Sequence, residues 1–228
     1  MIDVYGPNTP NVIKVTVCLE ELGLSYNRLP LDILKGEQFT PQFLAISPNN
    51  RVPAIVDHAP ADEAGPLPLF ESGAILVHLA EKAGRLLPQA PRPRSEVIAW
   101  VMWQMAGQGP MLGQCGHFRN YAPERIPYAA ERFEREAQRL YRVLDSRLKD
   151  RDFVAAGAYS IADIACWPWT LFHAHHGARL ADFPALERWH HQIAARPAVR
   201  RALGDFEVPP PKTDWTAEER KILFEQGR

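Results

Sequence analysis

Cysteine is scarce in this chain of 228 residues, which contains three widely spaced cysteines, Cys18, Cys115 and Cys166. A small and odd number fits reduced thiols in a reducing compartment better than it fits a disulfide framework. Long hydrophobic runs are absent as well. The longest candidate, around residues 72–80, is followed by Glu81 and Lys82 and is far shorter than a membrane crossing. A secretory leader pattern is also missing, so we expect a cytoplasmic protein with no membrane partner.

An excess of charge of one sign is missing too. The 26 Lys and Arg residues nearly balance the 27 Asp and Glu residues, and the formal net charge is -1. Such a chain has no general field that attracts nucleic acid, so we expect no nucleic-acid partner, and an anionic ligand has to be bound by local groups. The hydrophobic fraction of 46% is that of an ordinary globular protein, and the length suffices for one large domain or two small ones.

The first half of the chain alternates strand and helix patterns. A strand pattern at residues 2–5 leads through a turn-forming stretch into apolar residues at helical spacing, which end at Gly23. There follow a strand at 26–32, a helix start at Thr40-Pro41, two apolar runs at 52–56 and 67–70 suited to a hairpin, and a helix from Ser72 that ends before Gly84. This order predicts a small α/β domain at residues 1–84.

The second half shows no convincing strand pattern. Its strongest helical signal is an apolar stripe from Ile126 to Leu148 with steps of three or four residues. Ser160 and Asp163 have the spacing of a capping box at a helix start. We expect a proline-containing linker at residues 85–93, an all-helical domain at 94–204, and a tail at 205–228 with a short helix that starts near Thr216.

Seven stretches carry patterns that also occur together, in this order, in a known family. They are Thr9-Pro10-Asn11, residues 46–50, 52–58 and 70–76 in the first half, and residues 109–114, 126–128 and 159–168 in the second half. With them the chain resembles the glutathione transferases, and specifically the bacterial Nu class of disulfide-bond reductases, from Met1 to about Leu203. The resemblance implies the glutathione transferase fold, with an α/β thioredoxin-like N-terminal domain and an all-α C-terminal domain, assembled as a homodimer.

The resemblance also implies a reaction. Glutathione, reduced or as its disulfide, is the expected cosubstrate, and the expected activity is reduction of a small-molecule disulfide by thiol-disulfide exchange without a protein cysteine as nucleophile. Weak peroxidase and transferase activities are further expectations. Two alternatives stay open: a glutathione transferase that conjugates glutathione to an electrophile, and a non-catalytic binding module with the same fold.

Thr9 and Asn11 follow the first strand, in the loop where a thioredoxin-like redox protein carries its Cys-x-x-Cys motif. No cysteine stands there, so sulfur chemistry at this helix start requires a thiol that the ligand brings. The resemblance implies that the Thr9 hydroxyl and the Asn11 side-chain amide donate hydrogen bonds to that thiol as the catalytic residues. The alternative is an ordinary turn with a helix cap.

Two further pairs are implied to bind glutathione. The Val52–Pro53 bond is cis in the family, and such a turn lets the backbone groups of Val52 pair with an extended peptide. Glu71 and Ser72 lie where a strand ends and a helix begins, which favours a carboxylate. The resemblance implies that Ser72 holds the γ-glutamyl carboxylate and Glu71 the ammonium group. The alternatives are a proline at a strand edge and an ordinary N-cap.

Gln38 and Arg132 complete the glutathione-binding residues that the resemblance implies. Gln38 is expected near the glycyl end, and the guanidinium of Arg132 suits the carboxylates of the tripeptide. The alternative for Arg132 is a place on a solvated helix face. A metal interpretation of the histidines between His173 and His191 is set aside, because no cysteine or carboxylate completes a site at convincing spacing, and we expect no metal.

Overall fold

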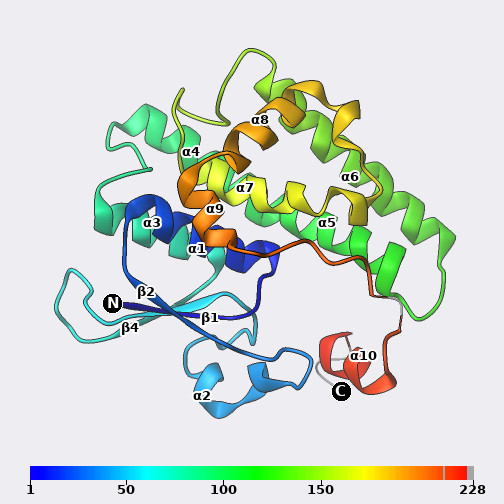
Figure 1. Ribbon diagram of the computed structural model, residues 1–228, viewed down its shortest axis with the longest axis horizontal. Coiled ribbons are helices and arrows are strands. Elements are labelled where there is room, and N and C mark those ends of the chain that lie inside the picture. Colours follow the sequence, from blue (N-terminus) through cyan, green and yellow to red (C-terminus); the bar gives the residue numbers. More distant parts are fainter. Residues whose placement is uncertain (213, 225–228) are drawn as a thin grey trace. The chain divides into compact units, whose positions relative to one another are not determined.

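The computed structural model describes residues 1–212 and 214–224. The chain divides into two compact units (Figure 1), one formed by residues 1–85 with the segment that starts at Asp214, and one that starts at Leu86 and ends before Asp214. Thr213 and the last four residues of the predicted tail, 225–228, lie outside the described residues. The domain boundaries drawn from the sequence stay a prediction.

A four-stranded mixed sheet forms the centre of the first unit. Its strands are β1 (Ile2–Tyr5), β2 (Tyr26–Leu29), β3 (Ala54–Asp57) and β4 (Leu67–Phe70), and its helical segments are α1 (Pro10–Leu22), η1 (Glu37–Phe39), α2 (Pro41–Leu44) and α3 (Ser72–Ala83). The strand order is β2-β1-β3-β4, with β1 parallel to β2 and antiparallel to β3, and β4 antiparallel to β3. This arrangement confirms the predicted thioredoxin-like fold. β2 ends before the predicted residue 32, because Pro30 has no N–H to extend the ladder.

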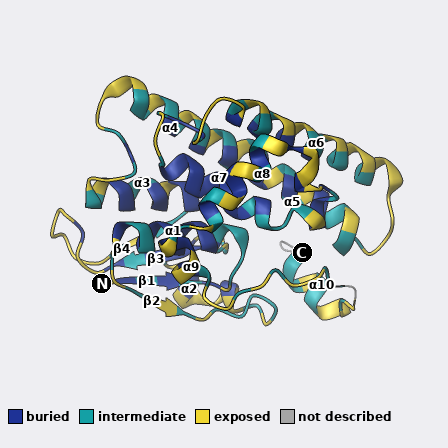
Figure 2. Cartoon of the chain, turned by 45° about the horizontal axis from the view of Figure 1, so that its top comes forward, coloured by how far each residue is buried: buried dark blue, intermediate teal, exposed yellow. Residues whose placement is uncertain are grey.

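Helix ends in this unit coincide with capping residues. Thr9 precedes Pro10 at the start of α1, and its side chain accepts a hydrogen bond from the Val12 N–H at 3.3 Å. Gly23 and Gly84 follow α1 and α3 with φ values of 70° and 63°, the left-handed conformation that glycine adopts freely. α1 and α3 pack on each other, and α1 is almost entirely buried (Figure 2).

The tail contributes a short helix, α10 (Ala217–Phe224), that belongs to the first unit. Thr216 and Glu219 form a reciprocal cap at its start: the Glu219 N–H donates to Thr216 Oγ1 at 3.1 Å, and the Thr216 N–H donates to Glu219 Oε2 at 2.9 Å. Ile222 lies against Gly36, where a β-carbon would be 3.9 Å from its Cγ2 atom. The tail helix therefore packs beside the segment that leads to Gln38.

Helices make up the described part of the second unit, residues 86–212. They are α4 (Pro91–Trp103), α5 (Gly109–Gly116), α6 (Pro127–Leu148), α7 (Ile161–Leu171), α8 (Pro184–Ala194) and α9 (Pro197–Leu203), with the short segments η2 (Gln104–Gln108), η3 (His117–Tyr121), η4 (His173–His176) and η5 (Leu180–Asp182). This confirms the predicted all-α class. α4 begins inside the segment predicted as a linker, because Pro91 is a favourable first helical residue. η2 is a π-helical turn directly before α5, whose second residue, Pro110, cannot donate a hydrogen bond to the carbonyl of Ala106.

The apolar stripe predicted from Ile126 to Leu148 forms α6, and its C-terminal half is the buried part. Ala137, Leu140, Leu144 and Leu148 are at most 1% exposed, whereas Ile126 is 46% exposed. Ile126 precedes the first helical residue, so it does not lie on the buried face of the helix. The periodicity therefore predicted the helix correctly and its buried face only in part.

The predicted capping box at Ser160 and Asp163 is confirmed at the start of α7, a helix that is nearly all buried (Figure 2). The Asp163 carboxylate accepts hydrogen bonds from the backbone N–H groups of Val154 and Ser160 at 2.9 and 3.0 Å. It also accepts one from the Trp189 indole N–H at 3.0 Å. One carboxylate therefore joins the α7 start to a preceding loop and to α8.

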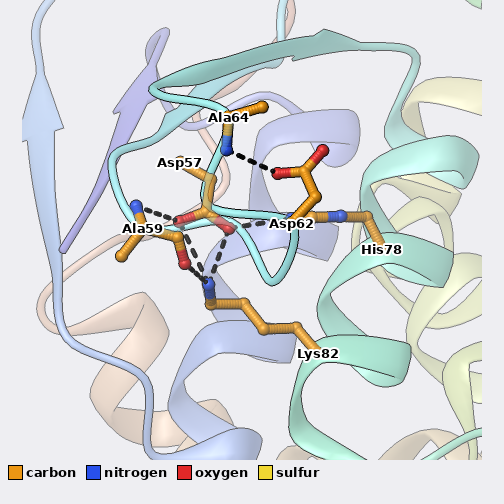
Figure 3. Close-up of polar contacts among 6 residues, drawn as sticks. All are labelled: Asp57, Ala59, Asp62, Ala64, His78 and Lys82. Carbon is orange, nitrogen blue, oxygen red and sulfur yellow. Dashed lines mark hydrogen bonds and ion pairs between the residues drawn. The ribbon is translucent and has the colours of Figure 1, made fainter.

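A second buried carboxylate, that of Asp57, ends β3 and connects it to α3 (Figure 3). Its Oδ2 atom lies 2.9 Å from both Lys82 Nζ and His78 Nε2, and its Oδ1 atom accepts from the Ala59 N–H at 3.1 Å. Lys82 Nζ also donates to the Ala59 carbonyl. Burial by itself raises the pKa of Asp57, but the hydrogen bonds from Lys82 and His78 outweigh burial, and the net pKa lies below the ordinary value.

We expect Asp57→Asn to lower the free energy of unfolding by about 3 kcal/mol at pH 7, because it removes the charge of one partner in a buried ion pair. The folded-state pKa is lowered, so this contribution is present above the unfolded value of about 3.9 and is lost as the pH falls through the folded value. Urea unfolding at pH 7 and at pH 3 measures both effects. Asp62→Asn is the matched control, since Asp62 is exposed and accepts from the Ala64 N–H at 3.2 Å (Figure 3). Equal losses in the two variants would contradict the assignment.

Candidate functional site

The strand register brings three segments to one edge of the sheet. Tyr5 ends β1 and pairs with Ala54, the first residue of β3, and Ala54 pairs in turn with Phe70, the last residue of β4. The residues that follow β1, precede β3 and follow β4 therefore meet at this edge. These segments contain six of the predicted site residues: Thr9, Asn11, Val52, Pro53, Glu71 and Ser72.

Two close contacts hold these segments together. Gly6 has a φ of 126°, and a β-carbon there would lie 2.9 Å from the Val52 Cβ and 2.9 Å from the Val12 Cγ2, so the loop after β1 approaches the turn before β3 closely because it has glycine. On the other side, Lys14 Nζ in α1 lies 3.1 Å from Ser72 Oγ at the start of α3. The six residues therefore lie on segments that meet within the first unit.

Thr9 and Asn11 lie at the N-terminus of α1. Thr9 is its N-cap, and its Oγ1 accepts from the Val12 N–H at 3.3 Å, a contact that does not use the hydroxyl hydrogen. Asn11 is the second residue of the helix and is half-buried. A helix N-terminus carries a partial positive charge, so both side chains lie where a negatively charged atom is stabilised.

The Val52–Pro53 peptide bond is cis, as the family resemblance implied. Pro53 is buried and Val52 is half-buried. The register between β1 and β3 begins at Ala54, so the backbone groups of Val52 lie outside that register. An extended peptide can pair with backbone groups in this position in the manner of an added strand.

Glu71 and Ser72 form the start of α3. Glu71 has φ and ψ values of 67° and 110°, a conformation that is strained for a residue other than glycine. Its side chain is exposed, while Ser72, the next residue, is 3% exposed. Strained residues of this kind cluster at ligand-binding sites, and here the strain coincides with a helix N-terminus.

Gln38 is buried in η1, and its amide already has a protein partner. Nε2 donates to the Ile33 carbonyl at 3.1 Å, and Oε1 is buried with no hydrogen-bond partner among residues 1–212 and 214–224. A role as a donor to glutathione therefore requires Nε2 to serve a second acceptor or to leave Ile33.

Arg132 belongs to the second unit, on α6. Its side chain is 55% exposed, and its Nη1 atom lies 3.9 Å from Glu136 Oε2. A long, exposed ion pair of this kind contributes little to stability, so the guanidinium can reorient toward a ligand at small cost.

The thiols of the three cysteines are not accessible from the surface. Cys18, Cys115 and Cys166 are all buried, at most 1% exposed. Burial raises the pKa of the Cys18 thiol far above its usual range and that of Cys115 to about 11. Thiols of this kind are poor nucleophiles at neutral pH. Residues 8–11, at the start of α1, contain no cysteine.

Lys14 lies beside these segments, in contact with Ser72, and the sequence pattern did not single it out. It is 1% exposed and lies on α1 between the buried Ile13 and Val15. Lysine is almost never fully buried without a partner. The sequence did contain one signal of its burial: Lys14 lies within an apolar run of a helix that otherwise faces the core.

Neither a metal-binding cluster nor a membrane-spanning helix occurs among residues 1–212 and 214–224. No group of three or more His, Cys, Asp or Glu side chains is arranged to hold a metal ion there. In the same part of the chain, none of the helices combines the length and the apolar character needed to span a bilayer.

Comparisons with known proteins agree with this geometry. The family model of the glutathione S-transferase N-terminal domain matches residues 2–81, and that of the C-terminal domain matches residues 118–197. The disulfide-bond oxidoreductase YfcG of Escherichia coli (strain K12) is 52% identical over 203 residues, which cover 89% of this chain and 94% of that protein.

Solved structures are similar over the same extent. A glutathione transferase from Pseudomonas putida, with one glutathione disulfide bound per subunit, has a TM-score of 0.84 at 40% identity, covering 90% of this chain and 91% of that one. One from Burkholderia graminis, with two glutathione molecules per subunit, has a TM-score of 0.84 at 41% identity, covering 90% and 88%. On the matches to both domain models and to a relative along nearly its whole length, this chain belongs to the glutathione transferase family.

Proposed function

We propose that this chain is a glutathione-dependent disulfide-bond reductase in which the reacting sulfur belongs to bound glutathione. The observation that carries the proposal is the absence of cysteine at the start of α1 together with the burial of Cys18, Cys115 and Cys166. The names of the E. coli relatives YfcG and YghU, both disulfide-bond oxidoreductases, support the reaction class. Neighbouring structures that hold glutathione or glutathione disulfide support the cosubstrate.

We propose that the sheet edge binds the tripeptide through three kinds of group. The backbone of Val52, before the cis bond to Pro53, pairs with the cysteinyl unit. Ser72 and the first N–H groups of α3 hold the γ-glutamyl carboxylate, which the positive end of the helix favours. The carboxylate of Glu71 meets the ammonium group of the same residue, so a zwitterion is bound by groups of both signs.

At the sulfur, the proposed donors are Thr9 and Asn11. Because Thr9 Oγ1 accepts from the Val12 N–H, its own hydrogen can point to the sulfur. The Asn11 amide is proposed as the second donor. Gln38 at the glycyl end and Arg132 on α6 complete the proposed binding residues.

The reaction balances with two glutathione molecules. The thiolate of the first attacks one sulfur of the disulfide, a mixed disulfide forms, and the other half leaves as a thiolate that takes up a proton. The thiolate of the second glutathione attacks the glutathione sulfur of the mixed disulfide and releases the second half of the substrate. Glutathione disulfide is the product, so two glutathiones are oxidised and one disulfide is reduced.

Magnitudes show what Thr9 and Asn11 can supply. Hydrogen bonds to a thiolate that lower its pKa from about 8.5 to about 7 raise the thiolate fraction at neutral pH roughly fifteenfold. The nucleophilicity of a thiolate falls as its pKa falls, which lowers the reactivity of each thiolate about fivefold. The net gain in rate is therefore about threefold. Most of the acceleration therefore has to come from holding the two sulfur atoms in line.

We further propose that the protein belongs to the Nu class, works in the cytoplasm as a homodimer, and has weak peroxidase and transferase activities. The identity to YfcG supports the class, and the three buried thiols suit a reducing compartment.

Light scattering after size-exclusion chromatography tests the homodimer, which is expected to have a mass twice the 25.7 kDa of one chain.

A variant without cysteine, carrying Cys18→Ala, Cys115→Ala and Cys166→Ala, is expected to keep glutathione-dependent reduction of bis(2-hydroxyethyl) disulfide within about threefold of the wild-type kcat/KM, because none of the three thiols takes part in the exchange. Steady-state kinetics measures this, and circular dichroism confirms that the variant is folded. Loss of turnover in the folded variant would rule out the proposed mechanism.

Asn11→Ala is expected to lower the rate more than the affinity for glutathione. Removing one of two donors raises the pKa of the bound thiol by about one unit, so the pH at which the rate is half-maximal moves up by that amount. At pH 7 the rate itself is expected to fall about twofold, and the dissociation constant of glutathione, measured by calorimetry, should change by less than that, so the shift in pH is the decisive readout. A binding module without activity would show unchanged affinity and no turnover in the wild type.

The alternative of conjugation to electrophiles is tested by assaying the wild type in parallel with bis(2-hydroxyethyl) disulfide and with 1-chloro-2,4-dinitrobenzene. The reductase proposal expects the disulfide to react with the higher kcat/KM, since both reactions use the same thiolate and conjugation also needs an apolar pocket. A faster reaction with the aryl halide would reverse the ranking of the two functions.

A further inference from the structure

A buried ammonium group lies directly beneath the start of α3. Lys14 is 1% exposed, and its Nζ atom is 3.1 Å from the Oγ atom of Ser72, which is itself 3% exposed. The two residues are 58 positions apart in the chain and come together because α1 and α3 pack on each other. A charge removed from water in this way is costly unless polar or charged groups compensate it.

The direction of this hydrogen bond is fixed by chemistry. An ammonium group has hydrogens to donate and no lone pair, so Ser72 Oγ is the acceptor. The hydroxyl hydrogen of Ser72 takes no part in this contact. A serine hydroxyl can otherwise act as donor or acceptor, and Lys14 favours the state in which it donates.

The position of Ser72 shows why the direction of this hydrogen bond matters for ligand binding. Ser72 is the first residue of α3, at the end of a helix whose backbone N–H groups also attract a negative charge. Glu71, the preceding residue, is exposed and carries the opposite charge. Anionic and cationic binding groups are therefore adjacent, and the anionic part of a ligand falls on the side of Ser72.

We infer that Lys14 is a specificity-determining positioning residue. It holds the Ser72 hydroxyl as a donor and supplies a positive charge behind it, so that this end of the site selects a ligand with an α-carboxylate, such as the γ-glutamyl unit. The inference rests on the proposed function, because it takes glutathione as the ligand at the sheet edge. Lys14 acts through Ser72 and through its field, and it contacts no reacting atom.

The test compares two ligands on three proteins. The ligands are glutathione and γ-aminobutyryl-cysteinyl-glycine, which lacks the α-carboxylate, and calorimetry gives the dissociation constant of each for wild type, Lys14→Met and Lys14→Gln. We expect Lys14→Met to raise the dissociation constant of glutathione about tenfold or more and that of the analogue less than twofold. The preference for the ligand with the carboxylate then falls about tenfold. Lys14→Gln keeps a donor without the charge and is expected to lie between.

Lys35→Met is the matched control, since Lys35 has a side chain that is 77% exposed and pairs with Asp32 in the same unit. It should leave both dissociation constants within twofold of the wild type. The kinetic readout is a rise in KM for glutathione with a smaller change in kcat, because Lys14 contributes to binding and not to the sulfur chemistry.

Several outcomes overturn the inference. Equal weakening of both ligands in Lys14→Met would assign Lys14 a structural role, and an unchanged preference would remove it from the site. If Lys14→Met does not fold, Lys14→Gln and Ser72→Ala decide: Ser72→Ala keeps the ammonium, so part of the preference should persist, and its complete loss would contradict the role of the charge. Failure of the wild type to bind glutathione at all would instead overturn the proposed function.

Discussion

The pairing of Tyr5 with Ala54 and of Ala54 with Phe70 is the constraint on which the rest of the site depends. A shift of one residue in either pairing would turn every side chain of a strand to the other face of the sheet. It would also move the cis turn away from the two helix starts beside it. Such a shift would also disturb the close approach of Gly6 to Val52. The chemistry of the edge therefore follows from the same packing that stabilises the sheet.

Two buried ionic groups in the first unit serve α3 in different ways. At its C-terminal part, His78 and Lys82 hold the carboxylate of Asp57, and this network fastens the helix to the end of β3 (Figure 3). At its N-terminus, the ammonium of Lys14 donates to Ser72. The helix is thus anchored by a carboxylate at its C-terminal part and faces a cation at its N-terminus.

Local signals predicted most of the fold, because glycine, proline and the cap residues act on their nearest neighbours. Gly23, Gly84 and the box at Ser160 are cases in which a few adjacent residues determine where a helix begins or ends. The site was harder to predict. Lys14 meets Ser72 across 58 positions, and Gln38 donates to Ile33 through its side chain, and neither contact leaves a trace in a periodic pattern. The order of the family motifs predicted which segments contain the candidate site residues. It did not predict which of their atoms already form hydrogen bonds within the protein.

The burial of the three cysteines has a consequence for the durability of the molecule. A catalyst that handles disulfides works among species that exchange with any accessible thiol, and a reactive surface cysteine would be capped by its own substrates or products. Cys18, Cys115 and Cys166 are withdrawn into the interior, where such adducts do not fit. The polypeptide can remain chemically unaltered while the ratio of oxidised to reduced small thiols around it swings widely, and its working state does not have to be regenerated by a separate reductant.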